Sequence, residues 1–193
     1  MGKLVVTEFV SVDGVFEDPG GSEEFEHGGW TFEYDRGDEG NAFKLDEVTE
    51  AEVQLLGRVT YEGFAAAWPS RDGPFADKLN ADPKVVVSTT LTDPEWQNTT
   101  VVSADVAEQI AKLKEETDGV ILVAGSGTLV RTLLEADLVD ELHLMVFPTI
   151  LGRGKRLFPD GIDRRKLALV ESRTVGGDGV QIQIYRRADD VAT

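Results

Sequence analysis

Hydrophobic residues along the chain form short runs that alternate with segments of helical periodicity. Runs of about four to eight apolar and β-branched residues bounded by Gly, Pro or Asp are typical of strands. They predict strands at 4–12, 51–57, 84–89, 99–103, 119–124, 140–148, 166–175 and 179–187. Apolar positions three and four residues apart predict helices at 41–50, 58–68, 106–116 and 128–136. Residues 20–40 follow neither period and are expected to be irregular, anchored by their aromatic side chains.

The order of these elements predicts an α/β fold. Strands that alternate with helices favour a mostly parallel central sheet with helices on both faces. The last two runs flank VGGDG (175–179), which predicts an antiparallel hairpin at the C-terminal end. The run at 140–148 alternates and is expected to carry one polar face. No linker or repeat interrupts the chain, so we expect a single domain over 1–187 and a frayed tail at 188–193.

Charge and composition then exclude several classes of protein. The chain has 193 residues, 36 acidic and 19 basic, with a net charge of -17. Such a surface repels nucleic acid, although a few donors could still hold one small anion. There are no cysteines and only two histidines, which leaves no cysteine-based or three-histidine metal site, so we expect no metal. Without a long apolar run or a signal peptide, we expect no membrane partner and a cytoplasmic location.

A glycine-rich turn between a strand and a helix is the first candidate for chemistry. Gly125, Ser126, Gly127 and Thr128 follow the apolar run at 119–124 and precede a helix. Unpaired N–H groups and the positive end of the helix dipole meet there, which favours a phosphate. The alternative is an ordinary turn in which Ser126 or Thr128 caps the helix. The three-glycine dinucleotide fingerprint is incomplete, because its third position is Val130.

Two further polar segments follow strands and could bind the same ligand. At the end of 51–57, Gly57 leads into a helix that begins with Arg58, whose guanidinium suits phosphate oxygens or a helix-flanking salt bridge. Ser88, Thr89 and Thr90 end another strand and could hold a 2′-phosphate or form a simple turn. Two strand-to-helix junctions could grip a pyrophosphate from opposite sides.

Five motifs in this order resemble the dihydrofolate reductase superfamily. They are SVDG (11–14), LLGRVTYE (55–62), VVVSTT (85–90), VAGSGTLVRTLL (123–134) and DELHLMVFPTILGRGKRLF (140–158). The likeness is greatest to the C-terminal reductase domain of the bifunctional riboflavin-biosynthesis deaminase-reductase and its stand-alone relatives. It implies a three-layer α/β/α dihydrofolate-reductase-like fold and an NADPH-dependent reductase, with 5-amino-6-(5-phosphoribosylamino)uracil reduction as the family-level activity.

The resemblance also implies which residues hold NADPH. The segment at 57–60 matches the one at the cofactor phosphates, 88–90 the one at the 2′-phosphate, and 125–129 the one at the pyrophosphate. Val10 matches the first strand beside the nicotinamide. The cofactor-binding residues expected are Val10, Gly57, Arg58, Val59, Thr60, Ser88, Thr89, Thr90, Gly125, Ser126, Gly127, Thr128 and Leu129.

The expected substrate side is carried by Asp13, Trp30 and Asn41. Asp13 could orient substrate or close the loop as an Asx turn, and Trp30 could line the cofactor and substrate side or simply anchor a lid. Dihydrofolate reductases carry an acid where Asn41 stands, and riboflavin-pathway reductases commonly carry a glutamate where Val123 stands. Both substrates of those enzymes are therefore expected to be poor ones.

The sequence favours hydride transfer to a small heterocyclic or carbonyl substrate, and no catalytic proton donor is identified. The alternatives are a dihydrofolate reductase and a non-catalytic NADP-binding regulatory protein. The terminal hairpin and the run at 140–148 provide a sheet edge and an apolar face, so we expect a homodimer.

Overall fold

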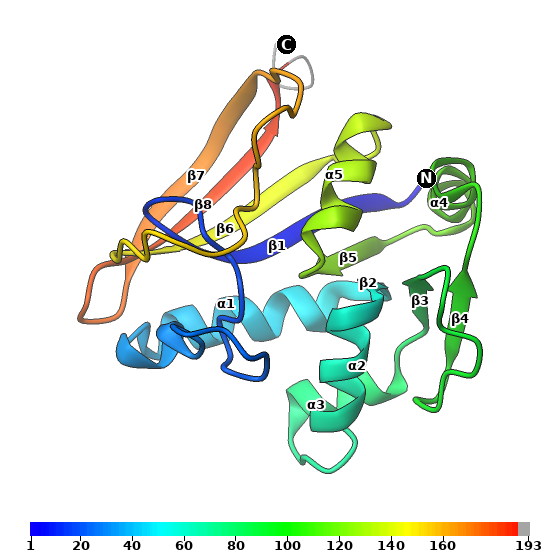
Figure 1. Ribbon diagram of the computed structural model, residues 1–193, viewed down its shortest axis with the longest axis horizontal. Helices are drawn as coiled ribbons and strands as arrows, with labels where there is room; N and C mark the ends of the chain where they lie inside the picture. Colours follow the sequence, from blue (N-terminus) through cyan, green and yellow to red (C-terminus); the bar gives the residue numbers. More distant parts are fainter. Residues whose placement is uncertain (189–193) are drawn as a thin grey trace. The chain divides into compact units, whose positions relative to one another are not determined.

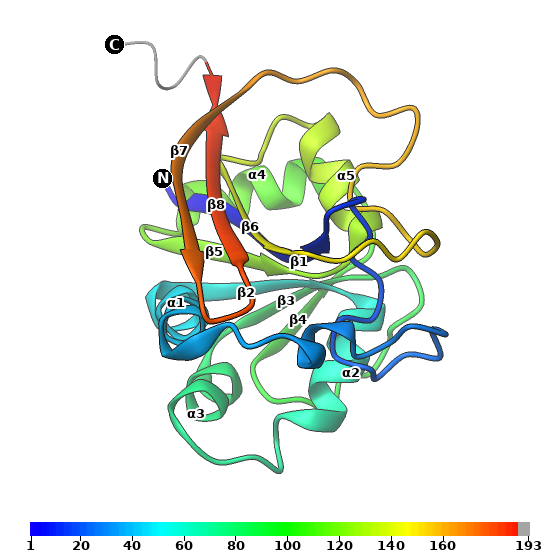
Figure 2. The same ribbon diagram turned by 90° about the vertical axis from the view of Figure 1, so that its left-hand side faces the viewer.

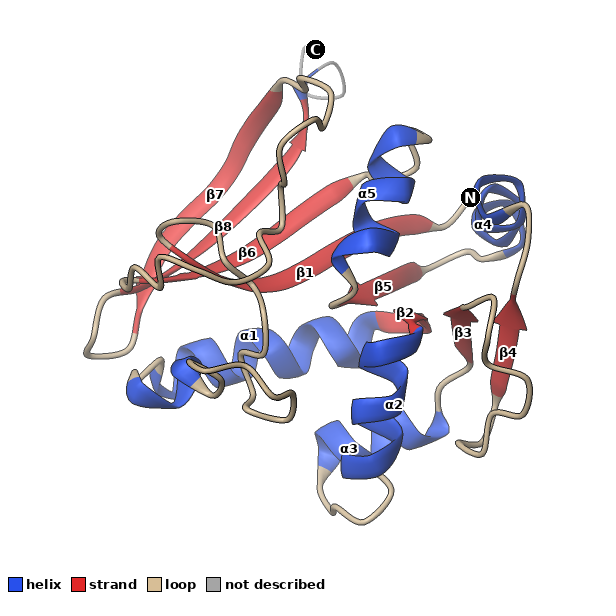
Figure 3. Cartoon of the chain, in the orientation of Figure 1, coloured by secondary structure: helices blue, strands red, loops and turns tan. Residues whose placement is uncertain are grey.

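A computed structural model describes residues 1–188 and confirms the α/β fold (Figures 1 and 3). Apart from Ala188, the tail expected at 188–193 lies outside the described residues. The helical elements are η1 (Trp30–Glu33), α1 (Gly37–Glu50), α2 (Arg58–Ala67), α3 (Pro74–Ala81), α4 (Val106–Glu116) and α5 (Gly127–Glu135). The strands are β1 (Lys3–Ser11), β2 (Ala51–Gly57), β3 (Lys84–Val87), β4 (Thr99–Val102), β5 (Val120–Ala124), β6 (Glu141–Phe147), β7 (Leu167–Val175) and β8 (Val180–Arg187).

The strands are hydrogen-bonded neighbours in the order β4-β3-β2-β5-β1-β6-β8-β7. The ladders β3–β4, β2–β3 and β2–β5 are parallel, whereas β6–β8 and β7–β8 are antiparallel. Parallel strands need crossover connections: α2 and α3 connect β2 to β3, α4 connects β4 to β5, and the loop 88–98 connects β3 to β4. The mostly parallel sheet and the C-terminal hairpin expected from the sequence are both present.

The chain forms two compact units, which we call unit 1 and unit 2. Unit 1 comprises Met1–Val5 and Lys44–Val139, and unit 2 comprises Val6–Phe43 and the described residues from Asp140 onward. Within unit 1, α4 and α5 lie on one side of the strands and α2 and α3 on the other (Figures 1 and 2). Helices on opposite faces follow when right-handed crossovers run in opposite directions along a parallel sheet.

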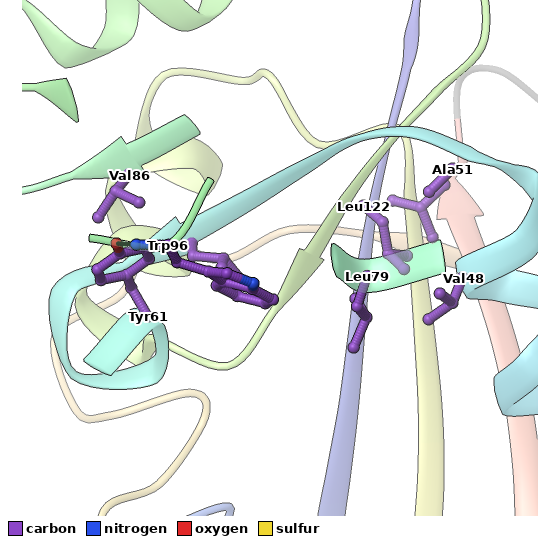
Figure 4. Close-up of a cluster of buried hydrophobic side chains, with 9 residues drawn as sticks. Val48, Ala51, Tyr61, Leu79, Val86, Trp96 and Leu122 are labelled. Atoms are coloured by element: carbon purple, nitrogen blue, oxygen red, sulfur yellow. Dashed lines mark hydrogen bonds between the residues drawn. The ribbon is translucent and has the colours of Figure 1, made fainter. Parts of the chain in front are cut away.

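The core of unit 1 forms where these helices meet the strands (Figure 4). Tyr61 of α2 packs on Trp96, and their ring centroids lie 6.1 Å apart. The Tyr61 hydroxyl accepts a hydrogen bond from the backbone N–H of Trp96 at 3.0 Å. Leu79 of α3 and Leu122 of β5 are both buried in the same cluster. Burying each such side chain contributes roughly 1.5–3 kcal/mol, so this cluster fixes α2 and α3 against the strands.

The core of unit 2 is aromatic. Phe147 at the end of β6 is fully buried, and the rings of Phe9, Trp30 and Tyr34 meet it edge to face at centroid distances of 5.6, 5.3 and 5.8 Å. Aromatic pairs in this geometry are worth about 0.5–1.5 kcal/mol beyond the area that they bury. This cluster orders the glycine-rich segment that was expected to be irregular, and four of its residues form η1.

Helix α3 and the early start of α1 were not predicted. Pro74 follows Gly73, and proline at the first helical position is a start signal for a helix, in which Ala76 and Leu79 are buried. Helix α1 begins at Gly37 rather than near residue 41. Asp38 and Glu39 in its first turn suit the positive end of the helix dipole. The glycines on either side of them indicated a loop and hid this start signal.

The polar face expected on the run at 140–148 was wrong. Five of the seven residues of β6 are buried, and the strand lies between β1 and β8 in the sheet order. The side chain of Glu141 is buried and pairs with Arg186, and His143 Nε2 lies 3.0 Å from a Glu141 carboxylate oxygen. Its polar residues therefore serve buried pairs and not a solvent-facing surface. Within residues 1–188, none of the helices has the length and apolar character needed to cross a membrane.

Candidate functional site

Three of the predicted cofactor segments follow the carboxyl ends of adjacent parallel strands in unit 1. Gly57 at the end of β2 pairs with Val87 at the end of β3, and Leu55 pairs with Val123 of β5. Ser88 therefore comes one residue beyond the β3 pair, and Gly125 comes level with Gly57. Ligands of open α/β sheets bind outside this edge, where neighbouring strands send their helices to opposite faces. β2 and β5 are such a pair, since α2 and α5 leave them on opposite faces (Figure 2).

Both helices that begin at this edge lack a side-chain cap. Gly57 occupies the N-cap position of α2 and Ser126 that of α5, and neither makes a capping side-chain bond within the described residues. In the first backbone hydrogen bond of α5, the Val130 N–H donates to the Ser126 carbonyl at 3.0 Å. The N–H groups at the start of each helix stay available, together with the positive end of each dipole, to bind an anion.

Ser126 is used for a different purpose from the cap that the sequence allowed. Its Oγ accepts the Gly57 N–H at 2.8 Å and lies 2.9 Å from Thr60 Oγ1, so one hydroxyl ties the start of α5 to the start of α2. Ser126 has φ 69° and ψ 67°, a left-handed conformation that costs a non-glycine residue about 1–2 kcal/mol. Strain of this kind is stored at functional sites when the surrounding contacts fix it.

Glycine is required on both sides of this junction. A Cβ built on Gly57 would clash with the Ser126 side chain, and one on Gly125 would lie 2.5 Å from Thr60 Oγ1. Gly125 also has φ +70°, a backbone conformation that residues with a side chain rarely adopt. The two turns therefore fit each other only without side chains at these positions, and the structure brings Gly57, Thr60, Gly125 and Ser126 together.

Arg58 makes the salt bridge that the sequence left open. Its Nη1 lies 3.0 and 2.9 Å from the two carboxylate oxygens of Glu62, one turn along α2, and the two side chains are 43% and 50% exposed. An exposed pair of this kind contributes only about 0.3–0.5 kcal/mol, so a phosphate can replace Glu62 at small cost. Val59, next on α2, is exposed at 48%. Glu62 itself was missed, although the i,i+4 spacing from Arg58 indicates it.

The segment 88–90 is a serine turn with two exposed hydroxyls beside it. Ser88 is buried, and its Oγ accepts the N–H groups of Thr90 at 3.1 Å and Leu91 at 2.9 Å. Thr89 and Thr90 are exposed. The turn interpretation therefore describes Ser88, and Thr90 Oγ1 lies 3.4 Å from the Ser88 Oγ. The two exposed threonine side chains and the Thr89 N–H are the groups that could reach a ligand.

Asp13, in unit 2, closes a loop. Its Oδ1 accepts the Ser11 hydroxyl at 2.7 Å and the Leu151 N–H at 3.1 Å, and its Oδ2 accepts the Gly152 N–H at 2.8 Å. Burial raises the pKa of this carboxyl, but the bonds from Ser11, Gly152 and Leu151 outweigh it and the pKa lies below its usual value. Because both oxygens are occupied, the loop role accounts for Asp13 without a substrate.

The other expected residues of unit 2 divide between core and surface. Trp30 is 2% exposed, and its Nε1 donates to the Glu17 carbonyl at 2.9 Å, so it anchors the segment that precedes η1. Val10 is buried in β1. Asn41 is exposed on α1, and its Oδ1 accepts the Arg36 Nε–H at 2.7 Å. Arg36 was not singled out from the sequence, and no local pattern marks it.

A model of the family described as RibD C-terminal domain matches residues 2–181. Two curated relatives are the uncharacterized proteins YwjB and YyaP of Bacillus subtilis (strain 168). YwjB is 29% identical over 186 residues, covering 95% of this chain and 98% of that protein. YyaP is 29% identical over 142 residues, covering 71% of this chain and 75% of that protein.

Two solved structures share the fold. A protein described as a riboflavin biosynthesis protein, from Shewanella sp. PV-4, aligns with a TM-score of 0.76 and 21% identity, covering 96% of this chain and 98% of that one. Dihydrofolate reductase from Enterococcus faecalis, complexed with NADP(H) and RAB-propyl, aligns with a TM-score of 0.63 and 18% identity, covering 97% of both chains. At these identities the likeness shows the fold alone, and it confirms the dihydrofolate-reductase-like architecture.

Proposed function

The chain belongs to the RibD C-terminal domain family, a family of reductase domains, and from that premise we propose that it is an NADPH-dependent reductase. The observation that carries the proposal is the pair of uncapped helix starts, α2 and α5, joined through Ser126 at the ends of β2 and β5. The solved dihydrofolate reductase of similar fold holds NADP(H), which supports the same cofactor class here.

The donors of unit 1 fit a dinucleotide phosphate group. N–H groups at the start of α5, from Gly127 to Leu129, would hold the pyrophosphate with those of Val59 and Thr60 in α2. Arg58 and the segment 88–90 would hold the extra phosphate that separates NADPH from NADH. The assignment of Val10 to the nicotinamide rests on the resemblance alone. The chemistry that this cofactor supplies is hydride transfer, for which the protein provides binding and orientation.

A titration with a matched control tests the cofactor. NADPH should bind tighter than NADH, and Arg58→Ala should weaken NADPH about 10-fold or more, the worth of a hydrogen bond to a charged group. Arg131→Ala is the control, because Arg131 also pairs with a glutamate four residues on, Glu135, at 44% and 48% exposure. Equal affinities for the two cofactors, or equal effects of the two variants, would contradict the proposal.

We propose that the substrate is a small heterocycle or carbonyl compound that differs from the substrates of dihydrofolate reductase and of the riboflavin-pathway reductase. Val123 is fully buried and Asn41 is an amide, so neither supplies the acid that those enzymes use. Each unpaired substrate donor costs about 1–3 kcal/mol, roughly 10- to 100-fold in affinity. With dihydrofolate or 5-amino-6-(5-phosphoribosylamino)uracil we expect kcat/KM below about 10⁴ M⁻¹s⁻¹, measured by NADPH oxidation.

A panel of pterins, pyrimidinones and quinones separates a reductase from a regulatory NADP-binding protein, which would bind cofactor and reduce none of them.

The homodimer and the cytoplasmic location stay predictions. For the dimer, the buried strand β6 no longer supplies an apolar face. Strand β7, at the edge of the sheet order, does expose Leu167, Leu169 and Val170. Light scattering at micromolar concentration measures the state against the 21.1 kDa monomer.

A further inference from the structure

Arg36 of unit 2 is held in a fixed position just before α1. Its Nε donates to the Asn41 Oδ1 at 2.7 Å, and its Cζ lies 5.2 Å from the ring centroid of Phe9. An arginine on an aromatic face gains about 0.5–2 kcal/mol from the ring quadrupole. The two contacts orient the guanidinium without using its two terminal nitrogens.

The backbone around Arg36 is fixed as well. Gly176, in the turn between β7 and β8, has φ +70°, and a Cβ there would clash with the Asp35 carbonyl and the Arg36 backbone. In the same turn the Asp178 carboxylate accepts the Asp35 N–H at 2.6 Å. A segment joined to a hairpin that is distant in sequence loses conformational freedom, so Arg36 is preorganised to bind a ligand.

The charge of Arg36 has no carboxylate partner within residues 1–188, in a chain with 36 acidic residues. Six other arginines do have one: Arg58, Arg131, Arg153, Arg173, Arg186 and Arg187. Arg36 is half-buried, and burial lowers the pKa of its guanidinium with no acid to oppose that effect. A partly desolvated cation without a counter-charge is a costly arrangement that a bound anion would relieve.

The groups presented beside Phe9 are donors. The terminal nitrogens of Arg36 and the Asn41 amide nitrogen offer N–H groups, while the Asn41 oxygen is already occupied by Arg36. A carboxylate at the same place would present acceptors and would select a ligand with donors. This donor set instead suits a ligand with oxygen acceptors, and the planar guanidinium fork matches the two oxygens of a carboxylate.

We propose that Arg36, oriented by Asn41 and Phe9, binds a carboxylate group of the substrate. The inference deepens the proposed reductase function, on which the word substrate rests, and it assigns the substrate to the class of compounds that carry a carboxylate. Asn41 acts as a positioning residue that also supplies one donor. Arg36 supplies the charge.

The test measures binding of benzoate, with benzamide as the neutral molecule of the same shape, to ¹⁵N-labelled protein with and without saturating NADP⁺. The reporter is the Arg36 Nε–H resonance, which its bond to Asn41 protects from exchange. For a ligand of this size we expect a benzoate Kd of about 1–10 mM, with benzamide at least about 5-fold weaker. Equal shifts with the two compounds, or no saturation by benzoate, would overturn the proposal.

Two variants keep the result independent of folding. Arg36→Met removes the charge and keeps an apolar stem, and its control is Arg71→Met, since the Arg71 Cζ also lies over a ring, 4.7 Å from the Trp68 centroid. Benzoate affinity should fall at least about 5-fold in the first variant and stay unchanged in the second. Asn41→Asp should fill the site with an internal carboxylate and lower benzoate affinity similarly without lowering the melting temperature. Unchanged benzoate binding in both variants of this site would also overturn the proposal.

The same samples separate the two hypotheses. Failure of NADP⁺ to bind contradicts the proposed reductase, whereas the benzoate result in those samples still decides the role of Arg36.

Discussion

The sheet edge of unit 1 and the loops of unit 2 use their polar groups in opposite ways. In unit 1, the edge formed by Gly57, Ser126 and the starts of α2 and α5 leaves backbone N–H groups uncapped. In unit 2, the loops at 11–29 and 149–157 direct their polar groups at each other: Asp13 bonds to Gly152, and Glu17 pairs with Lys155 at 2.6 Å. At the ends of strands and the starts of helices, backbone donors stay available for a ligand. Loops without regular secondary structure use their polar groups in hydrogen bonds and ion pairs that keep the loops ordered.

The largest effect expected from this contrast is on the glycine junction of unit 1. Gly57→Ala places a methyl group against the Ser126 side chain, which must move together with the start of α5. We expect NADP⁺ affinity to fall about 100-fold, because displacing the donors by even 1 Å costs that much in a preorganised site. Gly20→Ala is the control, since nothing lies within 4 Å of the added Cβ. Calorimetric titration of both variants measures the difference, and unchanged affinity in Gly57→Ala would remove the junction from the site.

The next effect concerns unit 2 and is one of stability. Asp13→Ala removes three hydrogen bonds to a carboxylate, and we expect it to lower the free energy of unfolding by about 1–3 kcal/mol. NADP⁺ affinity should change less than about 3-fold, because Asp13 is occupied within its own loops. Asp160→Ala, an exposed acid in the same unit, is the control. Urea unfolding and titration of the same samples would expose a ligand role for Asp13 if affinity fell more than stability.

The segments that were readable from sequence share one property. Strand 51–57 and helix 106–116 were predicted to the residue, because their period and their boundaries are local signals. The glycine turn was found for the same reason. The bond from Gly152 to Asp13 joins residues 139 apart, and the contact between Gly176 and Arg36 depends on a hairpin at the other end of the chain. No local pattern carries such pairs, so the chemistry of unit 2 emerged only with the fold.

The smallest effect is the acid dependence of stability. The pKa of the Asp13 carboxyl lies below its usual value, as described above. Burial raises the pKa of the Glu17 carboxyl, but hydrogen bonds and the charge of Lys155 outweigh burial, so this pKa is lowered as well. A carboxyl with a lowered pKa in the folded state stabilises the protein above its unfolded pKa, about 4, and this contribution is lost as pH falls below that value. Asp13→Asn should therefore flatten the fall in stability between about pH 5 and pH 3. Parallel curves for wild type and variant, from urea unfolding across this range, would show that Asp13 does not contribute.

The central claim is that nucleotide phosphates bind at the starts of α2 and α5, and backbone amide shifts on adding NADP⁺ test it most directly. In the ¹⁵N spectrum we predict the largest shifts at residues 57–60, 88–90 and 125–129. Inorganic pyrophosphate should reproduce those at 57–60 and 125–129 without those at 88–90. Shifts that avoid 125–129, or that gather in unit 2 with both ligands, would contradict the account.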